Sequence, residues 1–264
     1  MEWWVLYVVV GIAAGLLAGL LGVGGGVVVV PCLVFAFHVQ GLADQYVMPL
    51  ALGTSLAAIV VTAAASVRAH DGRGAVEWMV VHRLAPGLAL GALGGAWCAT
   101  WLSSNVLKGL FAGFLWLVAT RLVFDGAPRP TRALPGAGGL FVVGGAIGMV
   151  SGMTGIGGGT LSVPFLLRHR VPIHRTIGTA AAAGLPIAVA GATGYLVTGL
   201  AVSGLPSQSL GFIHLPALAG IAIASVATAP MGAALAHRMP THRLKTVFAG
   251  LLYLVGARLA FSAF

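Results

Sequence analysis

Charged residues are scarce in this chain. They make up 7% of its 264 residues, and only five of them are Asp or Glu. Soluble domains carry about 25% charged residues, so this composition excludes a water-soluble shell. No carboxylate lies securely inside an apolar segment, which argues weakly against a cation pathway and weakly for an anionic substrate.

Cysteine is also scarce, and the residue types of enzyme chemistry do not cluster. Cys32 and Cys98 lie in apolar segments without the spacing of metal ligands, so we interpret both as packing residues. No nucleophile stands beside an evident base, and no phosphate loop carries a lysine. We therefore expect no enzyme activity, no cofactor and no metal.

Apolar sequence is what the chain has in abundance. Hydrophobic residues make up 59% of it, and runs of about 20 apolar residues, enough to span a bilayer as helices, recur along its length. We predict an all-α polytopic membrane protein. Its ten apolar segments lie at 3–21, 27–37, 47–66, 79–101, 106–124, 137–153, 160–167, 177–198, 212–236 and 243–262.

A Gly-rich sequence occurs twice in the chain. Gly22–Gly26, followed by Pro31, returns as Gly155–Gly159, followed by Pro164. A second similar pair closes each half: Leu107–Gly113 with Arg121, and Leu244–Gly250 with Arg258. The chain is therefore two copies of one membrane unit. We predict a first repeat at 1–126, a linker at 127–136 and a second repeat at 137–264.

Basic residues indicate how the repeats are oriented. Suppose each short segment, 27–37 and 160–167, returns the chain to the side from which its predecessor entered. One side then holds all fourteen Lys and Arg except Lys108 and Arg258, and the positive-inside rule makes that side cytoplasmic. Five segments per half predict an inverted 5+5 repeat with eight full spans, two short half-helices and both termini outside, as in secondary transporters.

Because the basic residues are scattered over loops, the net charge of +9 does not indicate nucleic-acid binding.

The Gly runs predict breaks in their helices. Four glycines in five residues weaken a continuous helix by several increments of about 1 kcal/mol, and we expect Pro31 and Pro164 to interrupt the short segments that follow. Freed backbone N–H groups cannot stay bare in hydrocarbon, and a helix start attracts anions. We predict two Gly-lined pockets facing one central cavity. Its substrate-binding glycines are Gly22, Gly24, Gly25, Gly26, Gly155, Gly157, Gly158 and Gly159. Gly residues at four-residue spacing elsewhere, such as those at 11, 15 and 19, predict close helix packing.

Hydroxyl side chains near the Gly runs are few, and they occur beside only the second run. Ser151, Thr154, Thr160 and Ser162 flank the second run, whereas the matching first-copy positions are apolar. Another repeated element is Gly53-Thr54-Ser55, echoed as Gly178-Thr179-Ala180. A hydroxyl after Gly can bond a ligand oxygen or its own helix, and the sequence does not decide between the two. The predicted substrate-binding set adds Thr54, Ser55, Ser151, Thr154 and Thr179.

Two basic residues, Lys108 and Arg258, stand apart from the cytoplasmic cluster. They either attract anions or extend to the membrane interface, and we favour the second interpretation. His38, His82 and His214 border apolar segments, where a structural role is more common than a proton relay.

The doubled Gly runs with their prolines, the Gly53-Thr54-Ser55 element and the closing helix ending in Arg121 resemble the TauE/SafE sulfite exporter family. The resemblance covers nearly the entire chain. It implies a plasma-membrane permease for a small sulfur-containing oxyanion such as sulfite or a sulfonate. It also implies binding roles for residues 22–26 and 155–159, and less securely for Thr54 and Thr179.

We therefore predict a secondary transporter of small anions that works by alternating access. An anion channel of the same fold, or a permease for carboxylates or other small organic anions, is the alternative. The expected partners are the anionic substrate and the lipid bilayer, with no nucleic acid. Whether the chain forms a homo-oligomer is left open by the sequence. The expected location is the plasma membrane.

Overall fold

The computed structural model describes residues 2–21, 24–124, 133–169, 171–236 and 241–261. These residues form ten helices and one short hairpin. In chain order the elements are α1 (Glu2–Leu21), α2 (Gly26–Val39), α3 (Asp44–Asp71), α4 (Trp78–Thr100), α5 (Ser104–Phe124), α6 (Ala137–Thr154), α7 (Gly159–Arg168), α8 (Ile173–Leu200), β1 (Ser209–Leu210), β2 (Ile213–His214), α9 (Leu215–Ala236) and α10 (Thr241–Phe261).

Long apolar helices dominate the structure. Within the described residues, six helices (α1, α3, α4, α6, α8 and α9) are long and apolar enough to cross a membrane. The predicted all-α membrane class is confirmed, and each predicted segment corresponds to a helix. Several boundaries differ: α3 runs over Asp44–Asp71 instead of 47–66, and α8 begins at Ile173 instead of 177. α9 begins at Leu215 instead of 212, because Ile213 pairs with Leu210 across a turn at Gly211, whose φ is +55°.

Both Gly runs break their helices, as the sequence predicts. α1 ends at Leu21 and α2 begins at Gly26, while α6 ends at Thr154 and α7 begins at Gly159. Gly24, Gly25 and Gly155 have φ values of +76°, +75° and +64°, which side chains rarely tolerate.

The predicted interruptions at Pro31 and Pro164 were wrong. Pro31 lies inside α2 and Pro164 inside α7, and both helices continue through them. A proline removes one backbone hydrogen bond and crowds the carbonyl four residues earlier. Helices packed among neighbours in a membrane protein tolerate that loss, and α2 packs on α3 while α7 packs on α8.

Gly faces bring two pairs of helices into backbone contact. A Cβ atom on Gly15 would lie 2.5 Å from the Ser225 carbonyl oxygen, so α1 packs directly on α9. A Cβ atom on Gly91 would lie 2.1 Å from the Gly145 carbonyl oxygen, so α4 packs equally closely on α6. Residue numbers rise together along both contacts, and the helices of each pair therefore run parallel. These are the close packing faces that four-residue Gly spacing predicts.

Two other pairs of helices run antiparallel. Across the α3–α8 contact, Gly53 faces Tyr195 and Gly178 faces His70. Early residues of each helix therefore meet late residues of the other. Along the α5–α10 contact, the Thr120 hydroxyl bonds the Tyr253 hydroxyl at 2.7 Å, and Gly256 faces Trp116. Each of the four contacts joins the first half of the chain (α1–α5) to the second half (α6–α10).

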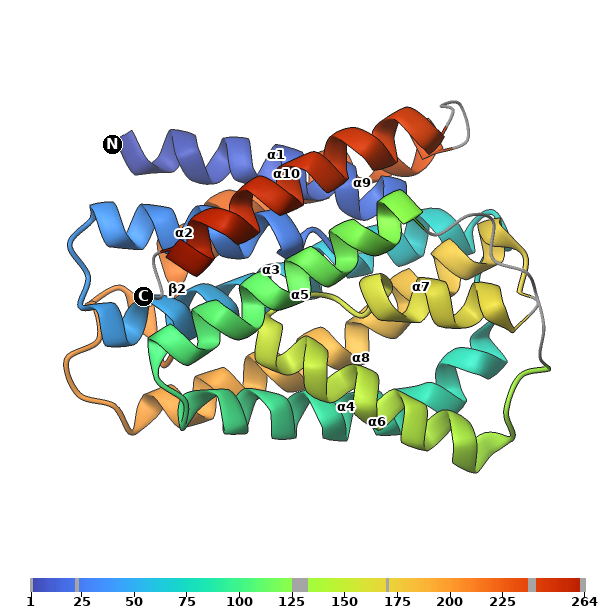
Figure 1. Ribbon diagram of the computed structural model, residues 1–264, viewed down its shortest axis with the longest axis horizontal. Coiled ribbons are helices and arrows are strands. Elements are labelled where there is room, and N and C mark those ends of the chain that lie inside the picture. The colour runs from blue at the N-terminus through green and yellow to red at the C-terminus, as the bar shows by residue number, and fades with distance from the viewer. Residues whose placement is uncertain (1, 22–23, 125–132, 170, 237–240, 262–264) are drawn as a thin grey trace.

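The connections between helices lie at two ends of the bundle (Figure 1). Residues 72–77 and 171–172 lie at one end, on the right of the figure, and residues 40–43, 101–103 and 201–208 lie at the other. Each of α2 and α7 returns the chain to the end where the preceding helix began. Basic residues in the last turns of α3, α5 and α7 share the first end: Arg68, Arg121 and Arg168. Most of the predicted linker lies outside the described residues.

Candidate site at the two helix breaks

The two helix breaks meet in the middle of the structure. A Cβ atom on Gly24 would lie 3.3 Å from the Gly157 Cα, and one on Gly26 would lie 2.6 Å from the Gly155 carbonyl oxygen. One break therefore packs its backbone directly against the other. Gly22, which was also predicted for this site, lies outside the described residues.

The starts of the two short helices carry backbone hydrogen-bond donors without a side-chain cap. Neither Gly25 nor Gly158 supplies a side-chain cap, and the first backbone bonds to their carbonyls come from Val28 and Leu161. The N–H groups of the first turn have no acceptor within their own helix. They give each helix start a positive potential that favours an anion.

A small cavity of about 10 Å³ lies where the breaks meet. This volume is about what one water molecule requires. Its lining comes from both breaks and from α1, α3 and α8: Ala18, Gly24, Ile59, Ala63, Ser66, Gly157, Ala181 and Gly184. In this conformation the space between the breaks is smaller than an oxyanion.

Ser66 is the polar side chain of this cavity. It is 1% exposed, and its hydroxyl has no hydrogen-bond partner among the described residues. Ile59, Ala63 and Ser66 follow helical spacing along one face of α3, which directs all three to the cavity. Ser66 was not among the predicted site residues. A hydroxyl on the same face as two small or apolar residues was the available signal.

Three further buried hydroxyls flank the second break and have no partner in the part of the chain that the structure describes: Ser151, Thr160 and Ser162. Thr154 differs, because its hydroxyl donates to the Val150 carbonyl at 2.8 Å within its own helix. The Ser55 hydroxyl donates to the Gly155 carbonyl at 2.8 Å. Ser55 therefore holds the second break against α3, while Ser151 keeps an unused hydroxyl.

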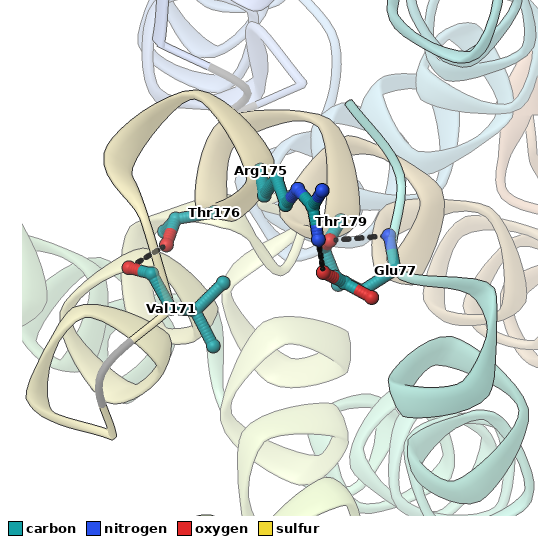
Figure 2. A network of polar contacts seen from close by, with 5 residues as sticks. All are labelled: Glu77, Val171, Arg175, Thr176 and Thr179. Atoms are coloured by element: carbon teal, nitrogen blue, oxygen red, sulfur yellow. Dashed lines mark hydrogen bonds and ion pairs between the residues drawn. The ribbon is translucent and has the colours of Figure 1, made fainter. Parts of the chain in front are cut away.

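Thr54 and Thr179 each hold the start of a helix from the other half of the chain. The Thr54 hydroxyl accepts a hydrogen bond from the backbone N–H of His214, directly before α9, at 2.8 Å. The Thr179 hydroxyl accepts one from the backbone N–H of Glu77, directly before α4, at 2.9 Å (Figure 2). The two contacts are equivalent, because α4 and α9 occupy the fourth position in their halves.

The glycines before these threonines make the contacts possible. A Cβ atom on Gly53 would lie 2.2 Å from the Phe212 carbonyl oxygen, and one on Gly178 would lie 2.2 Å from the Ala75 carbonyl oxygen. Only glycine lets the incoming backbone approach so closely. The repeated Gly-Thr element is thus a docking point for the connection that leads into a helix of the other half.

The second docking point carries an additional ion pair at its edge. Arg175 on α8 points to the Glu77 carboxylate, with a nitrogen–oxygen distance of 2.5 Å, and both side chains are partly open to solvent (Figure 2). Thr176, one turn away from Thr179, donates instead to the Val171 carbonyl at 3.1 Å. Glu77 is therefore attached to α8 through its backbone and its side chain.

Acidic side chains lie away from the breaks in the part of the chain that the structure describes. Asp44 begins α3, Asp71 ends it, and Glu77 precedes α4. No group of three or more His, Cys, Asp or Glu residues there is arranged to hold a metal ion. The environment of the two breaks consists of backbone amides, hydroxyls and apolar side chains.

Comparison with known proteins identifies the family. The profile described as "Sulfite exporter TauE/SafE" matches residues 7–259. A "Probable membrane transporter protein" of Haemophilus influenzae is 36% identical over 253 residues, which cover 95% of each chain. Similar proteins from Methanocaldococcus jannaschii (24% identical; 95% of this chain and 93% of the relative) and Bacillus subtilis (26% identical; 97% of each) carry the same description. No solved structure matches the chain. The chain belongs to the TauE/SafE sulfite exporter family, whose curated relatives are named as membrane transporters rather than enzymes.

Proposed function

We propose that this membrane transporter carries small anions, with sulfite or an organosulfonate as the substrate. The meeting of the two helix breaks carries the proposal. Their uncapped helix starts, the cavity between Gly24 and Gly157, and the unpartnered Ser66 hydroxyl place hydrogen-bond donors around one point. Such donors, without a nearby carboxylate, suit an oxyanion. The family description agrees with a sulfur oxyanion.

The proposed architecture is an inverted repeat of five helices in each half. The antiparallel contacts α3–α8 and α5–α10, between helices at the same position in their halves, support it. The contacts α1–α9 and α4–α6 support it as well, because exchanging the two halves converts one pair into the other. Helix ends rich in arginine lie at one end of the bundle, and the positive-inside rule makes that end cytoplasmic in a plasma-membrane protein.

The proposed mechanism is alternating access at the breaks. A cavity of about 10 Å³ cannot hold sulfite, so one half must move against the other to open the site to either side. The ligand-binding groups in this proposal are the backbone amides of residues 24–26 and 157–159, together with the hydroxyls of Ser66, Ser151, Thr160 and Ser162. Thr54, Ser55 and Thr179 position the helices, because their hydroxyls already bond backbone groups of the other half.

The test is sulfite flux into proteoliposomes with the variant Ser66→Ala. A hydrogen bond to a charged group contributes about 1.5–3 kcal/mol, so we expect sulfite flux to fall roughly 10- to 100-fold. The melting temperature should stay the same or rise, because the hydroxyl that is removed has no partner. The matched control is Ser207→Ala, in the exposed connection before α9. Wild-type flux through folded Ser66→Ala protein would refute the site.

Two further measurements separate the alternatives. Sulfite on the opposite side of the membrane accelerates uptake by a carrier and not by a channel, so an absence of counterflow would favour an anion channel. Competition of labelled sulfite uptake by sulfoacetate and by acetate separates the sulfonate class from the carboxylate class. Stronger inhibition by acetate would favour a carboxylate permease.

A further inference from the structure

A large cleft lies away from the helix breaks and is lined by residues of α2, α5 and α10, with Leu6 of α1. Its volume is about 700 Å³, within the range of ligand-binding pockets. We propose that this cleft binds an anionic phospholipid. In this site the lipid phosphate lies between Lys108 and Arg258, and an acyl chain lies along Phe35 and Leu254.

The polar part of the cleft is positively charged. Lys108 is only 5% exposed, and Arg258 is held with its Cζ atom 4.8 Å from the centre of the Phe35 ring. The one carboxylate of the lining, Asp44, lies 3.2 Å from the His38 Nδ1 atom. Lys108 also lies near the start of α5, where the helix dipole favours an anion. The cleft therefore favours a phosphate group.

The rest of the lining is apolar, and part of it faces outward. Phe35 and Leu254 are 45% and 68% exposed, and Leu6, Val34 and Leu259 continue the apolar wall. In a bilayer this outward-facing wall contacts acyl chains, whereas a free inorganic anion would fill only the polar part of the lining. An amphiphile covers both parts of the lining.

The position of the two cations along the helices fits a lipid headgroup. Lys108 lies near the first turn of α5 and Arg258 in the last turn of α10. Basic side chains near the ends of spanning helices reach the interface where phosphate groups lie. Both belong to the sequence elements that close each half, so the cleft pairs the lysine of the first copy with the arginine of the second.

The experiment is native mass spectrometry of the full chain in detergent with added phosphatidylglycerol or phosphatidylcholine. We expect phosphatidylglycerol to bind more tightly than phosphatidylcholine, and Arg258→Gln to weaken the binding of phosphatidylglycerol alone. The expected loss is on the order of fivefold for the removed charge. Arg121→Gln is the matched control, because it removes the corresponding arginine of the first copy, at the far end of α5.

Arg258 is exposed, so its substitution should leave the fold intact, and Lys108→Gln provides a second variant at the buried cation. Equal binding of the two lipids, or equal losses in Arg258→Gln and Arg121→Gln, would overturn the proposal. Stabilisation by sulfite or inorganic phosphate that depends on Arg258, without lipid preference, would overturn it in favour of a free-anion site. Neither result bears on Ser66 and the central cavity.

Discussion

Replacing Thr54 by valine should destabilise the protein although the side-chain shape is nearly kept. Thr54 is fully buried, and its hydroxyl is the acceptor for the backbone N–H of His214 at 2.8 Å. Valine removes that acceptor and leaves the donor without a partner at the start of α9. Water has little room to replace the lost acceptor, because Gly53 packs against the Phe212 carbonyl oxygen of the same connection.

The expected magnitude follows from the unsatisfied donor. An unpaired buried N–H group costs about 1–3 kcal/mol. For a chain of this size, 1 kcal/mol shifts the melting temperature by roughly 2–4 °C. We therefore expect Thr54→Val to melt about 2–12 °C below wild type. Thr179→Val should lie at the lower end of this range, because the Glu77 N–H group that it leaves unpaired is only partly buried.

The assay is thermal unfolding of the purified protein in detergent, monitored by tryptophan fluorescence and by loss of the monodisperse peak in size-exclusion chromatography. Thr193→Val is the matched control, since the exposed Thr193 hydroxyl on α8 bonds only the Val189 carbonyl of its own helix. Surface substitutions of this kind usually change stability by no more than about 0.5 kcal/mol. If Thr54→Val and Thr193→Val melt at the same temperature, the inference that Thr54 holds the other half of the chain is wrong.

Three other outcomes are expected in the same thermal assay. Gly178→Ala should destabilise the protein by about 1–3 kcal/mol through overpacking. Gly113→Ala, where no atom lies within 4 Å of the added Cβ, should be neutral or stabilising by up to about 1 kcal/mol. Equal melting temperatures of the two variants would contradict the docking contact at Gly178. Arg175→Gln should cost at most about 1 kcal/mol, and less in high salt, because its ion pair is partly exposed; a larger, salt-independent loss would show that this pair is essential. Burial lowers the pKa of His214, and its neutral Nδ1 accepts a hydrogen bond from the Ala217 N–H. The stability that neutral His214 contributes is therefore present above about pH 6.5. It is lost as the pH falls through the pKa of His214 in the folded protein. The melting temperature of His214→Asn should consequently fall less than that of wild type between pH 7.5 and pH 5, and an equal fall would exclude this role.

Local physical chemistry made much of the fold predictable from the sequence. Runs of about 20 apolar residues predict spanning helices wherever they occur, and each predicted segment is a helix in the structure. The breaks at 22–26 and 155–159 were equally predictable, because consecutive glycines weaken a helix in any context. Pro31 and Pro164 were mispredicted, because contacts with neighbouring helices offset the missing hydrogen bond.

The partners of individual polar groups could not be predicted in this way. Thr54 and Thr179 stand in similar repeated sequences, and a bond to a ligand oxygen or to their own helix fitted each of them. Both hydroxyls instead bond backbone groups more than 100 residues away in the chain. The only signal for Ser66 was its place on the same helix face as Ile59 and Ala63, because the cavity beside it forms where two distant breaks meet at α3.

A helical membrane protein with two broken helices could be predicted without the structure, because hydrophobic length and glycine flexibility act within a few turns of one segment. Three arrangements appear only in the folded protein: the breaks meet, each half of the chain holds a helix start of the other, and Lys108 and Arg258 line one cleft. Those arrangements depend on which helix faces lie against each other, and packing between distant segments sets that choice.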